Sequence, residues 1–285
     1  MTGPQIAMLP DGRRLHLNHG PIDLIVQAFG PPDECELAYR QAAGRFRTVL
    51  EELVAELPAL RAQVQPGTRF AGPVARRMAA AVEPHASDFV TPMAAVAGSV
   101  ADEMLAALVS GRALERAYVN NGGDSALFLT PGTEMRLGIG ATGNEFGDRI
   151  VIDAASPVRG VATSGWRGRS FSLGIADAVT VLARTAAEAD VAATLIANAV
   201  DLPGHTAIRR RSARELQPDT DLGDREVTVA VGRLTAAEAR EALSKGLAVA
   251  EDFRRRGLIH AAALALNGEK MLVSDGQRQL VGEHA

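Results

Sequence analysis

The chain has 285 residues, enough for one large domain or two smaller ones with a substantial core. Its 30 basic and 34 acidic residues give a net charge of −4, which argues against a nucleic-acid-binding protein that relies on a general positive field. The single cysteine excludes an internal disulfide and a thiolate metal cluster.

The N-terminus lacks the basic start, apolar run and small-residue cleavage site of a secretory signal. The most apolar stretch, Pro92 to Val109, is interrupted by a serine and two acidic residues, which argues against a membrane span. We therefore expect a soluble cytoplasmic protein that binds neither membranes nor nucleic acid. A homodimer is one open possibility for its assembly.

The first part of the chain predicts a hairpin followed by helices. Apolar positions alternate on both sides of Gly20-Pro21, and helical periodicity begins near Asp33. Proline suits the first turn of a helix, so Pro73 and Pro92 are expected to open helices. The expected elements are a hairpin over 14–28, a helix over 33–64 that Pro58 bends or ends, a helix over 73–82 and a helix from Thr91-Pro92 onwards.

The second part predicts clustered strands and two long helices. Strands are expected at 118–119, 126–129, 135–141, 148–154, 159–163, 177–183, 226–231, 259–266 and 271–273. Helices are expected from Thr185, where Thr-Ala-Ala-Glu matches a capping box, and over 235–256. The polar stretch from Asp201 to about Asp224 is expected to be a connection. Long helices and clustered strands without regular alternation predict an α+β fold.

The segment Gly138 to Gly143 matches the pattern GxGxxG. A dinucleotide-binding loop of this kind must open a helix whose N-terminus receives the pyrophosphate. A turn and another strand follow here, so we interpret the segment as a hairpin turn.

The helix that begins at Thr185 carries Asp190, Thr194 and Asn198 on one side of an otherwise apolar surface. Asp190 and Thr194 are four residues apart, so their oxygens can converge on one point. A carboxylate and a hydroxyl are hard oxygen ligands that suit Mg²⁺, which keeps waters and shares substrate phosphates. The alternative is that the three side chains form the solvated stripe of the helix. The absence of lysine and arginine from Val191 to Val200 favours the metal interpretation.

Two glycine-containing turns are candidate ligand-binding segments. Thr163-Ser164-Gly165 ends a strand with amides and hydroxyls that can hold phosphate oxygens, while Arg167 or Arg169 supplies charge. The segment Asn120 to Asp124 is first of all a hairpin turn, and its two glycines also allow a flat ring or a ribose to approach.

Three single residues have two open interpretations each. Gly98 lies inside a predicted helix, where glycine requires either a packing or a binding reason. Asp177 is either a further acidic site residue or an ordinary residue at a strand edge. Trp166, the only tryptophan, is either a lid that stacks on a ring or an anchor in the core.

Five segments, in this order, resemble the ApbE superfamily of flavin transferases, and most closely its branch of uncharacterised cytoplasmic proteins. They are Pro92–Asp102, Val119–Asp124, Ala162–Gly165, Ala176–Val181 and Ala189–Thr194. The resemblance implies one ApbE-like domain over 1–285, with its motif-bearing core at about 92–200 and a C-terminal α/β extension at about 225–285. It also implies T-fold-like mixed sheets packed with helices, and a ligand cleft between two lobes.

In that family, the resemblance implies, FAD is bound together with Mg²⁺, and FMN is transferred to a protein threonine or serine. The metal pair of the family falls on Asp190 and Thr194, which are therefore both the metal and the catalytic candidates. The cofactor-binding candidates are Gly98, Asp102, Asn121, Gly122, Gly123, Asp124, Thr163, Ser164, Gly165, Arg169 and Asp177.

The chain departs from the transferase pattern at two points. The lysine that precedes the helix glycine in the family is replaced by Ala97, and the His-x-x-Asp-Pro segment is absent between Trp166 and Ile175. Loss of a group that handles a proton costs on the order of 10²–10⁴ in rate. Three functions stay open: FMN transfer or pyrophosphate cleavage on FAD or a related nucleotide, cofactor biosynthesis on another ring-bearing anion such as a pterin, and non-catalytic binding of a flavin or nucleotide.

Overall fold

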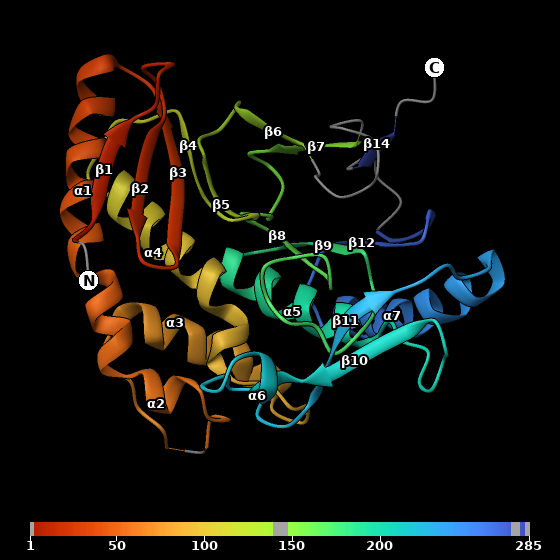
Figure 1. Cartoon of the computed structure of the whole chain (residues 1–285). Helices are drawn as coiled ribbons and strands as arrows, with labels where there is room; N and C mark the ends of the chain where they lie inside the picture. Colours follow the sequence, from red (N-terminus) through yellow and green to blue (C-terminus); the bar gives the residue numbers. More distant parts are fainter. Residues whose placement is uncertain (1–2, 66, 139–147, 275–279, 283–285) are drawn as a thin grey trace. The chain divides into compact units, whose positions relative to one another are not determined.

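The computed structural model describes residues 3–65, 67–138, 148–274 and 280–282 (Figure 1). The chain forms two compact units. Unit 1 contains Met1–Met135, Ile152–Val161 and Arg184–Asp190, and unit 2 contains Arg136–Val151, Ala162–Ala183 and Val191–Ala285. Each unit combines helices with β-strands that pair in an antiparallel way, which confirms the α+β class. The prediction that the chain is a single ApbE-like domain with a cleft between lobes stays a prediction.

The strands of unit 1 follow one another in sequence and in space. They are β1 (Gln5–Met8), β2 (Leu15–His19), β3 (Ile22–Phe29), β4 (Arg116–Asn121) and β5 (Asp124–Leu129), each antiparallel to the next. The predicted N-terminal hairpin is confirmed, because Leu17 pairs with Leu24 and both are buried. The start of β8 (Gly160–Ser164) pairs with β5. Strand β1 was not predicted, since its four residues, Gln-Ile-Ala-Met, show no alternation of polar and apolar residues.

The helices of unit 1 cover these strands with a shared apolar core. They are α1 (Pro32–Ala55), α2 (Leu57–Leu60), α3 (Pro73–Val82), η1 (Glu83–His85), η2 (Pro92–Ala95) and α4 (Val96–Val109). The prediction that a helix opens at Thr91-Pro92 is confirmed in position, because Thr91 precedes and Pro92 begins the helical segment, but its first turn is not α-helical. Pro92 opens a 3₁₀ turn, Thr91 makes no side-chain capping bond, and α4 begins at Val96.

The segment Pro92–Val109 is the one helix among the described residues that is long and apolar enough to cross a membrane, by length and composition only. Half of it is buried, and α4 packs against α1, α3, β4 and β5. In unit 1 this helix therefore serves as the centre of the core.

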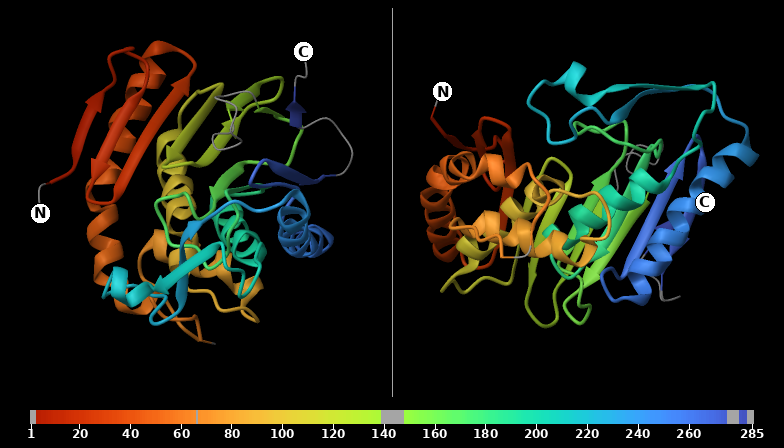
Figure 2. Two further views of the ribbon diagram at one scale, coloured as in Figure 1. Left: turned by 45° about the vertical axis from the view of Figure 1, so that its right-hand side comes forward. Right: turned by 90° about the horizontal axis from the view of Figure 1, so that it is seen from below.

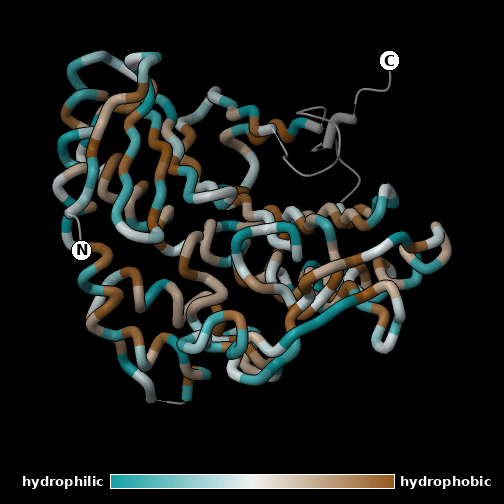
Figure 3. Tube along the Cα trace, viewed as in Figure 1, coloured by the Kyte–Doolittle hydropathy of each residue, from teal (hydrophilic) through white to brown (hydrophobic). Residues whose placement is uncertain are grey.

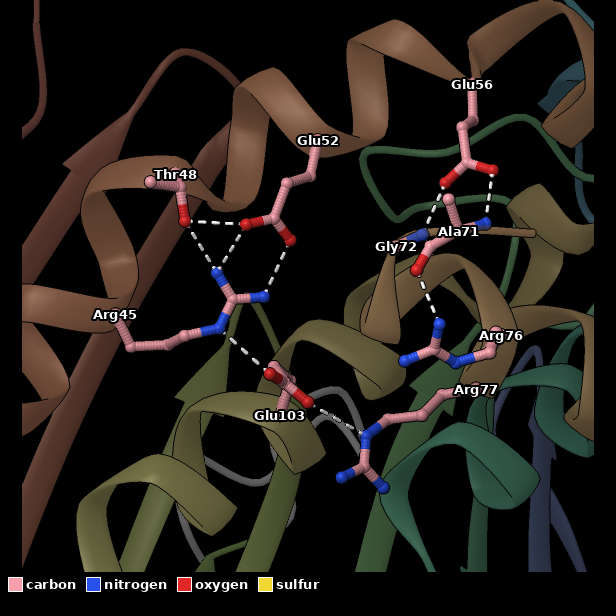
Figure 4. Close-up of polar contacts among 9 residues, drawn as sticks. All are labelled: Arg45, Thr48, Glu52, Glu56, Ala71, Gly72, Arg76, Arg77 and Glu103. Carbon is pink, nitrogen blue, oxygen red and sulfur yellow. Dashed lines mark hydrogen bonds and ion pairs between the residues drawn. The ribbon is translucent and has the colours of Figure 1, made fainter.

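Ion pairs join the polar sides of α1, α3 and α4 (Figure 4). The Arg45 guanidinium donates to both oxygens of Glu52, at 2.9 and 2.7 Å, and its Nε donates to Glu103 at 2.9 Å. The second oxygen of Glu103 accepts from Arg77 at 3.2 Å. At the start of α3, the Glu56 carboxylate accepts two backbone amides. Through Glu103 these bonds join α1 and α3 to α4, which carries the predicted site residues Gly98 and Asp102.

In unit 2, β9 (Ala178–Ala183), β12 (Ala261–Leu266) and β13 (Glu269–Val273) pair in an antiparallel way. Helix α7 (Ala236–Arg255) lies along β12 and β13 (Figure 2) and begins with a capping box between Thr235 and Glu238. Helix α5 (Ala186–Ala199) begins in unit 1, and its residues from Val191 onwards belong to unit 2. A three-stranded sheet has the order β14 (Leu280–Gly282), β7 (Asp148–Asp153), β6 (Glu134–Gly138).

The prediction of a plain connection between Asp201 and Asp224 was wrong. It contains β10 (Ile208–Ser212), which pairs with β11 (Glu226–Val231), and the short helix α6 (Ala213–Leu216). Figure 3 shows β10 as largely hydrophilic, so its sequence carries no apolar signal. Backbone pairing with β11 makes this segment a strand. The GxGxxG hairpin prediction concerns residues 138–143, and 139–143 lie outside the described residues.

Candidate functional site

Each of the helices α4 and α5 provides an aspartate that caps the first turn of the other helix. The first amides of any α-helix lack partners within the helix. The Gly98 amide donates to Asp190 Oδ2 at 3.0 Å, and the amides of Ala186 and Ala187 donate to the two oxygens of Asp102 at 3.0 and 2.9 Å. These amides are therefore engaged by carboxylates and are not open donors for a phosphate.

This arrangement requires glycine at position 98. A methyl group there would lie 2.7 Å from the Ala187 amide nitrogen and closer still to the Ala186 carbonyl. The structure thus supplies a packing reason for Gly98, while a role in cofactor binding stays a prediction. Gly160 allows a similar approach to Thr185, just before α5.

The predicted capping box at the start of α5 is confirmed in one half. Thr185 Oγ1 accepts from the Glu188 amide at 3.1 Å, as the sequence predicts. The Glu188 carboxylate pairs with Arg184 at 3.2 Å and makes no return bond to the backbone. The amides of Ala186 and Ala187 are capped by Asp102 from α4, which local sequence patterns do not reveal.

The β4–β5 hairpin turn lies beside the start of α4. Gly122 and Gly123 have φ of 66° and 133°, and Asn121 pairs with Asp124 across the turn, so the hairpin prediction is confirmed. Asn121 Nδ2 donates to the Ala97 carbonyl at 3.1 Å, which ties the turn to the helix. A Cβ at Gly123 would meet nothing within 4 Å, so the outer side of this turn is open.

Carboxylates gather in this part of unit 1. Asp190 keeps some exposed surface but is surrounded by protein, and this burial raises its pKa well above the ordinary value. The Asp124 carboxylate raises it further, and the amides of Gly98 and Ala97 oppose the shift. Burial also raises the pKa of Asp102 to about 6, against amide donation from α5. A cation bound here would offset the repulsion between these carboxylates and favour their ionised forms.

The chemistry of these groups fits a magnesium ion. Carboxylate oxygens are the ligands that Mg²⁺ prefers, and the Thr194 hydroxyl, one turn after Asp190 on α5, has no hydrogen-bond partner among the described residues. No cluster of three or more His, Cys, Asp or Glu side chains suited to a metal occurs in the described part of the chain. A cation at Asp190 would therefore take most of its remaining ligands from water or substrate oxygens, as Mg²⁺ commonly does.

Asp102 should make stability depend on pH. Its pKa in the folded protein, about 6, lies above its ordinary value of 3.8. The free energy of unfolding is therefore highest below pH 4 and falls as the pH rises through 6. The loss amounts to about 3 kcal/mol, at 1.4 kcal/mol for each pKa unit. Urea unfolding between pH 4 and 7 should show a smaller decline for Asp102→Asn than for the wild type. An unchanged decline in Asp102→Asn, equal to that of the exposed-site control Glu51→Gln, would contradict this role.

In unit 2, the loop after β8 is organised by Asp177. Its Oδ1 accepts from Trp166 Nε1 at 3.1 Å and from Arg167 Nε at 2.6 Å, and its Oδ2 accepts from the Asn267 amide at 2.6 Å. A Cβ at Gly165 would lie 2.6 Å from the Asp177 carbonyl, so the loop passes close to this residue. Both Asp177 oxygens are thus used within the protein.

The other predicted residues of this loop differ in their surroundings. The Thr163 hydroxyl lies 2.9 Å from that of Thr180 on β9, and Ser164 is half-buried. Arg169 is exposed and has no partner among the described residues. The cofactor-binding roles of these residues stay predictions.

Asn198 has neither of the two roles that the sequence leaves open for it, a place beside Asp190 and Thr194 or one in a solvated stripe. Its Oδ1 accepts from the Leu173 amide at 3.0 Å and from Ser172 Oγ at 3.4 Å, and so holds the segment before β9. Gly174 passes so close to the end of α5 that a Cβ there would overlap the Ala197 carbonyl oxygen. Asn198 is therefore neither part of a solvated stripe nor a partner of Asp190.

Comparison with known proteins identifies the family. A family model described as AbpE bacteria matches residues 6–273. UPF0280 proteins are similar as well: the one from Methanothrix thermoacetophila is 37% identical over 161 residues, 54% of this chain and 65% of the relative. The one from Methanosphaerula palustris is 37% identical over 165 residues, 56% of this chain and 67% of the relative. The chain thus spans about two thirds of the length of these curated relatives.

Two solved structures have low similarity to this chain. The ApbE protein of Thermotoga maritima has a TM-score of 0.39 and 15% identity, over 87% of this chain and 77% of its own. The flavinyl transferase ApbE of Pseudomonas stutzeri, in its apo form, has a TM-score of 0.41 and 14% identity, over 97% of each chain. The family assignment therefore rests on the family model and the sequence relatives, which confirm the predicted resemblance.

Proposed function

This chain belongs to the family described as AbpE bacteria and is related to the UPF0280 proteins, and on that premise we propose that it binds FAD or a related nucleotide together with Mg²⁺. The observation that carries the proposal is Asp190, a carboxylate in a protein-dense position whose negative charge is opposed by that of Asp124. A divalent cation would offset that repulsion and would also attract a pyrophosphate.

In this proposal Asp190 and Thr194 hold the ion, and the Gly98 amide fixes the orientation of the Asp190 carboxylate. When bound, the ion neutralises phosphate charge during FMN transfer or pyrophosphate cleavage. The open side of the turn at Gly122 and Gly123 would let a ring or ribose approach the backbone. A cytoplasmic location and a homodimer stay predictions.

A second candidate is nucleotide binding without transfer to a protein. It is favoured by the segment from Trp166 to Ile175, which has no histidine and no Asp-Pro pair. A non-catalytic flavin-binding protein and a biosynthetic enzyme for another ring-bearing anion, such as a pterin, both agree with this feature.

Titration of the purified protein with FAD, FMN and ADP, with and without Mg²⁺, tests the proposal. We expect binding of at least one of these nucleotides that Mg²⁺ strengthens about tenfold or more, equivalent to about 1.4 kcal/mol. Release of AMP from FAD would identify the enzyme, and tight binding of intact FAD would identify the carrier. Absence of any Mg²⁺-dependent binding would overturn the proposal.

A further inference from the structure

Arg167, in the loop after β8, is held on two sides. Its Nε donates to Asp177 Oδ1 at 2.6 Å, and its guanidinium carbon lies 4.7 Å from the centre of the Trp166 ring. Trp166 is itself fixed, because its Nε1 donates to the same Asp177 oxygen at 3.1 Å and its backbone amide donates to the Ala176 carbonyl at 3.0 Å. The side chain of Arg167 is therefore oriented before any ligand arrives.

The outer part of this guanidinium is open. The Arg167 side chain is 61% exposed, whereas the Asp177 side chain is 17% exposed. Only Nε of Arg167 has a hydrogen-bond partner among the described residues, so Nη1 and Nη2 keep their N–H groups available as donors. Two parallel N–H groups of a planar guanidinium match the spacing of two oxygens of a phosphate.

The Arg167–Asp177 pair differs from an ordinary surface ion pair. In Arg211–Glu215 both side chains are more than half exposed, and pairs of that kind contribute little to stability. In contrast, Asp177 also binds Trp166 and the Asn267 amide, so it stays in place whether or not Arg167 is present. The contacts of Asp177 and Trp166 therefore orient the Arg167 guanidinium in advance. A group oriented in this way loses less conformational freedom when it binds an anion.

We propose that Arg167 recognises a phosphate or pyrophosphate group of the ligand, and that Asp177 and Trp166 are positioning residues for it. This inference rests on the proposed function, in which a nucleotide supplies such a group, and it concerns unit 2 by itself. It also separates Arg167 from Arg169, which is exposed and has no fixed orientation among the described residues.

The only tryptophan provides the assay, because Trp166 lies against Arg167. Inorganic pyrophosphate, ADP and adenosine are titrated into the full chain at low salt, and the tryptophan fluorescence and the bound heat are followed. Arg167→Lys keeps the charge but removes the planar fork, so we expect about a tenfold weaker affinity for pyrophosphate and ADP. Binding of adenosine, which has no phosphate, should not change.

Matched variants separate recognition from general charge. Arg209→Ala removes an exposed arginine of unit 2 that has no partner among the described residues, and should bind like the wild type. Asp177→Asn keeps one acceptor oxygen but weakens the fixation of Arg167, so it should lower the affinity in the same direction, and its unfolding temperature is measured to confirm that it folds. Equal pyrophosphate affinity in Arg167→Lys and the wild type would overturn the inference.

The outcomes distinguish this inference from the proposed function. Binding of ADP that is unchanged in Arg167→Lys overturns the inference and leaves the proposed function standing. Binding of pyrophosphate that depends on Arg167, without binding of any nucleotide, supports the inference and overturns the proposed function. A wild-type protein that binds neither these compounds nor FAD nor FMN overturns both.

Discussion

Asparagine in place of Asp190 is expected to stabilise the metal-free protein and to abolish its response to Mg²⁺. Burial and the Asp124 carboxylate raise the pKa of Asp190 above its value in the unfolded chain. At neutral pH this carboxyl group therefore lowers the free energy of unfolding. Asparagine keeps an oxygen for the Gly98 amide and carries no charge. We therefore expect the free energy of unfolding without metal to be higher in Asp190→Asn than in the wild type.

With Mg²⁺ present, Asp190→Asn should be less stable than the wild type, the opposite of the order expected without metal. Loss of a metal ligand should weaken Mg²⁺ binding by about 100-fold or more, since even outer partners of a metal site contribute 10- to 100-fold. Thermal unfolding with and without Mg²⁺, at fixed FAD, measures both effects in one series. Thr194→Val should lose part of the response to Mg²⁺, and Asp23→Asn, which removes an exposed carboxylate of unit 1, should retain it. Equal stabilisation of Asp190→Asn and the wild type by Mg²⁺ would show that Asp190 acts as a helix cap only.

Alanine in place of Gly98 should be among the most destabilising single changes in the chain. The added methyl group would overlap the backbone of Ala186 and Ala187, and backbone at a helix start cannot move aside without losing the bonds to Asp102. Overpacking of this kind costs about 1–3 kcal/mol, and the backbone nature of the obstacle places the expected value at about 3 kcal/mol. The same shift would disturb Asp190, so binding of Mg²⁺ should weaken as well.

Gly44 offers a matched control for this substitution. It lies in α1, also inside a helix, and a Cβ there would meet nothing within 4 Å. Gly44→Ala should therefore stabilise the protein by up to about 1 kcal/mol, because alanine favours the helix over glycine. Chemical denaturation of the two variants beside the wild type should give changes of opposite sign. Similar small effects at both positions would mean that α4 and α5 do not approach as closely as described.

Several elements were predictable because a local pattern decides them. Pro73 opens α3, the apolar stripe that begins near Asp33 gives α1, and the Asn-Gly pair before Asp124 gives a hairpin turn. Where the local signal is ambiguous the prediction was right only in part. Thr91-Pro92 has the residues of a helix cap, yet Pro92 opens a 3₁₀ turn and α4 begins at Val96.

For the candidate site, the sequence by itself determined which residue types lie together on short segments. It brought out Asp190 with Thr194 on one helix and the two glycines before Asp124, because helix and hairpin geometry follow from spacing alone. The family, too, was evident from the order of its motifs, and the model match over residues 6–273 confirms it.

Only the tertiary structure decided what those groups do for one another. That Asp102 caps α5, that Gly98 lets the two helices approach, and that Asp177 orients Arg167 all depend on residues far apart in the chain. The physical reason is that a buried amide or carboxylate must find a partner, and any segment that packs beside it can provide one. Local sequence carries no record of which segment that will be.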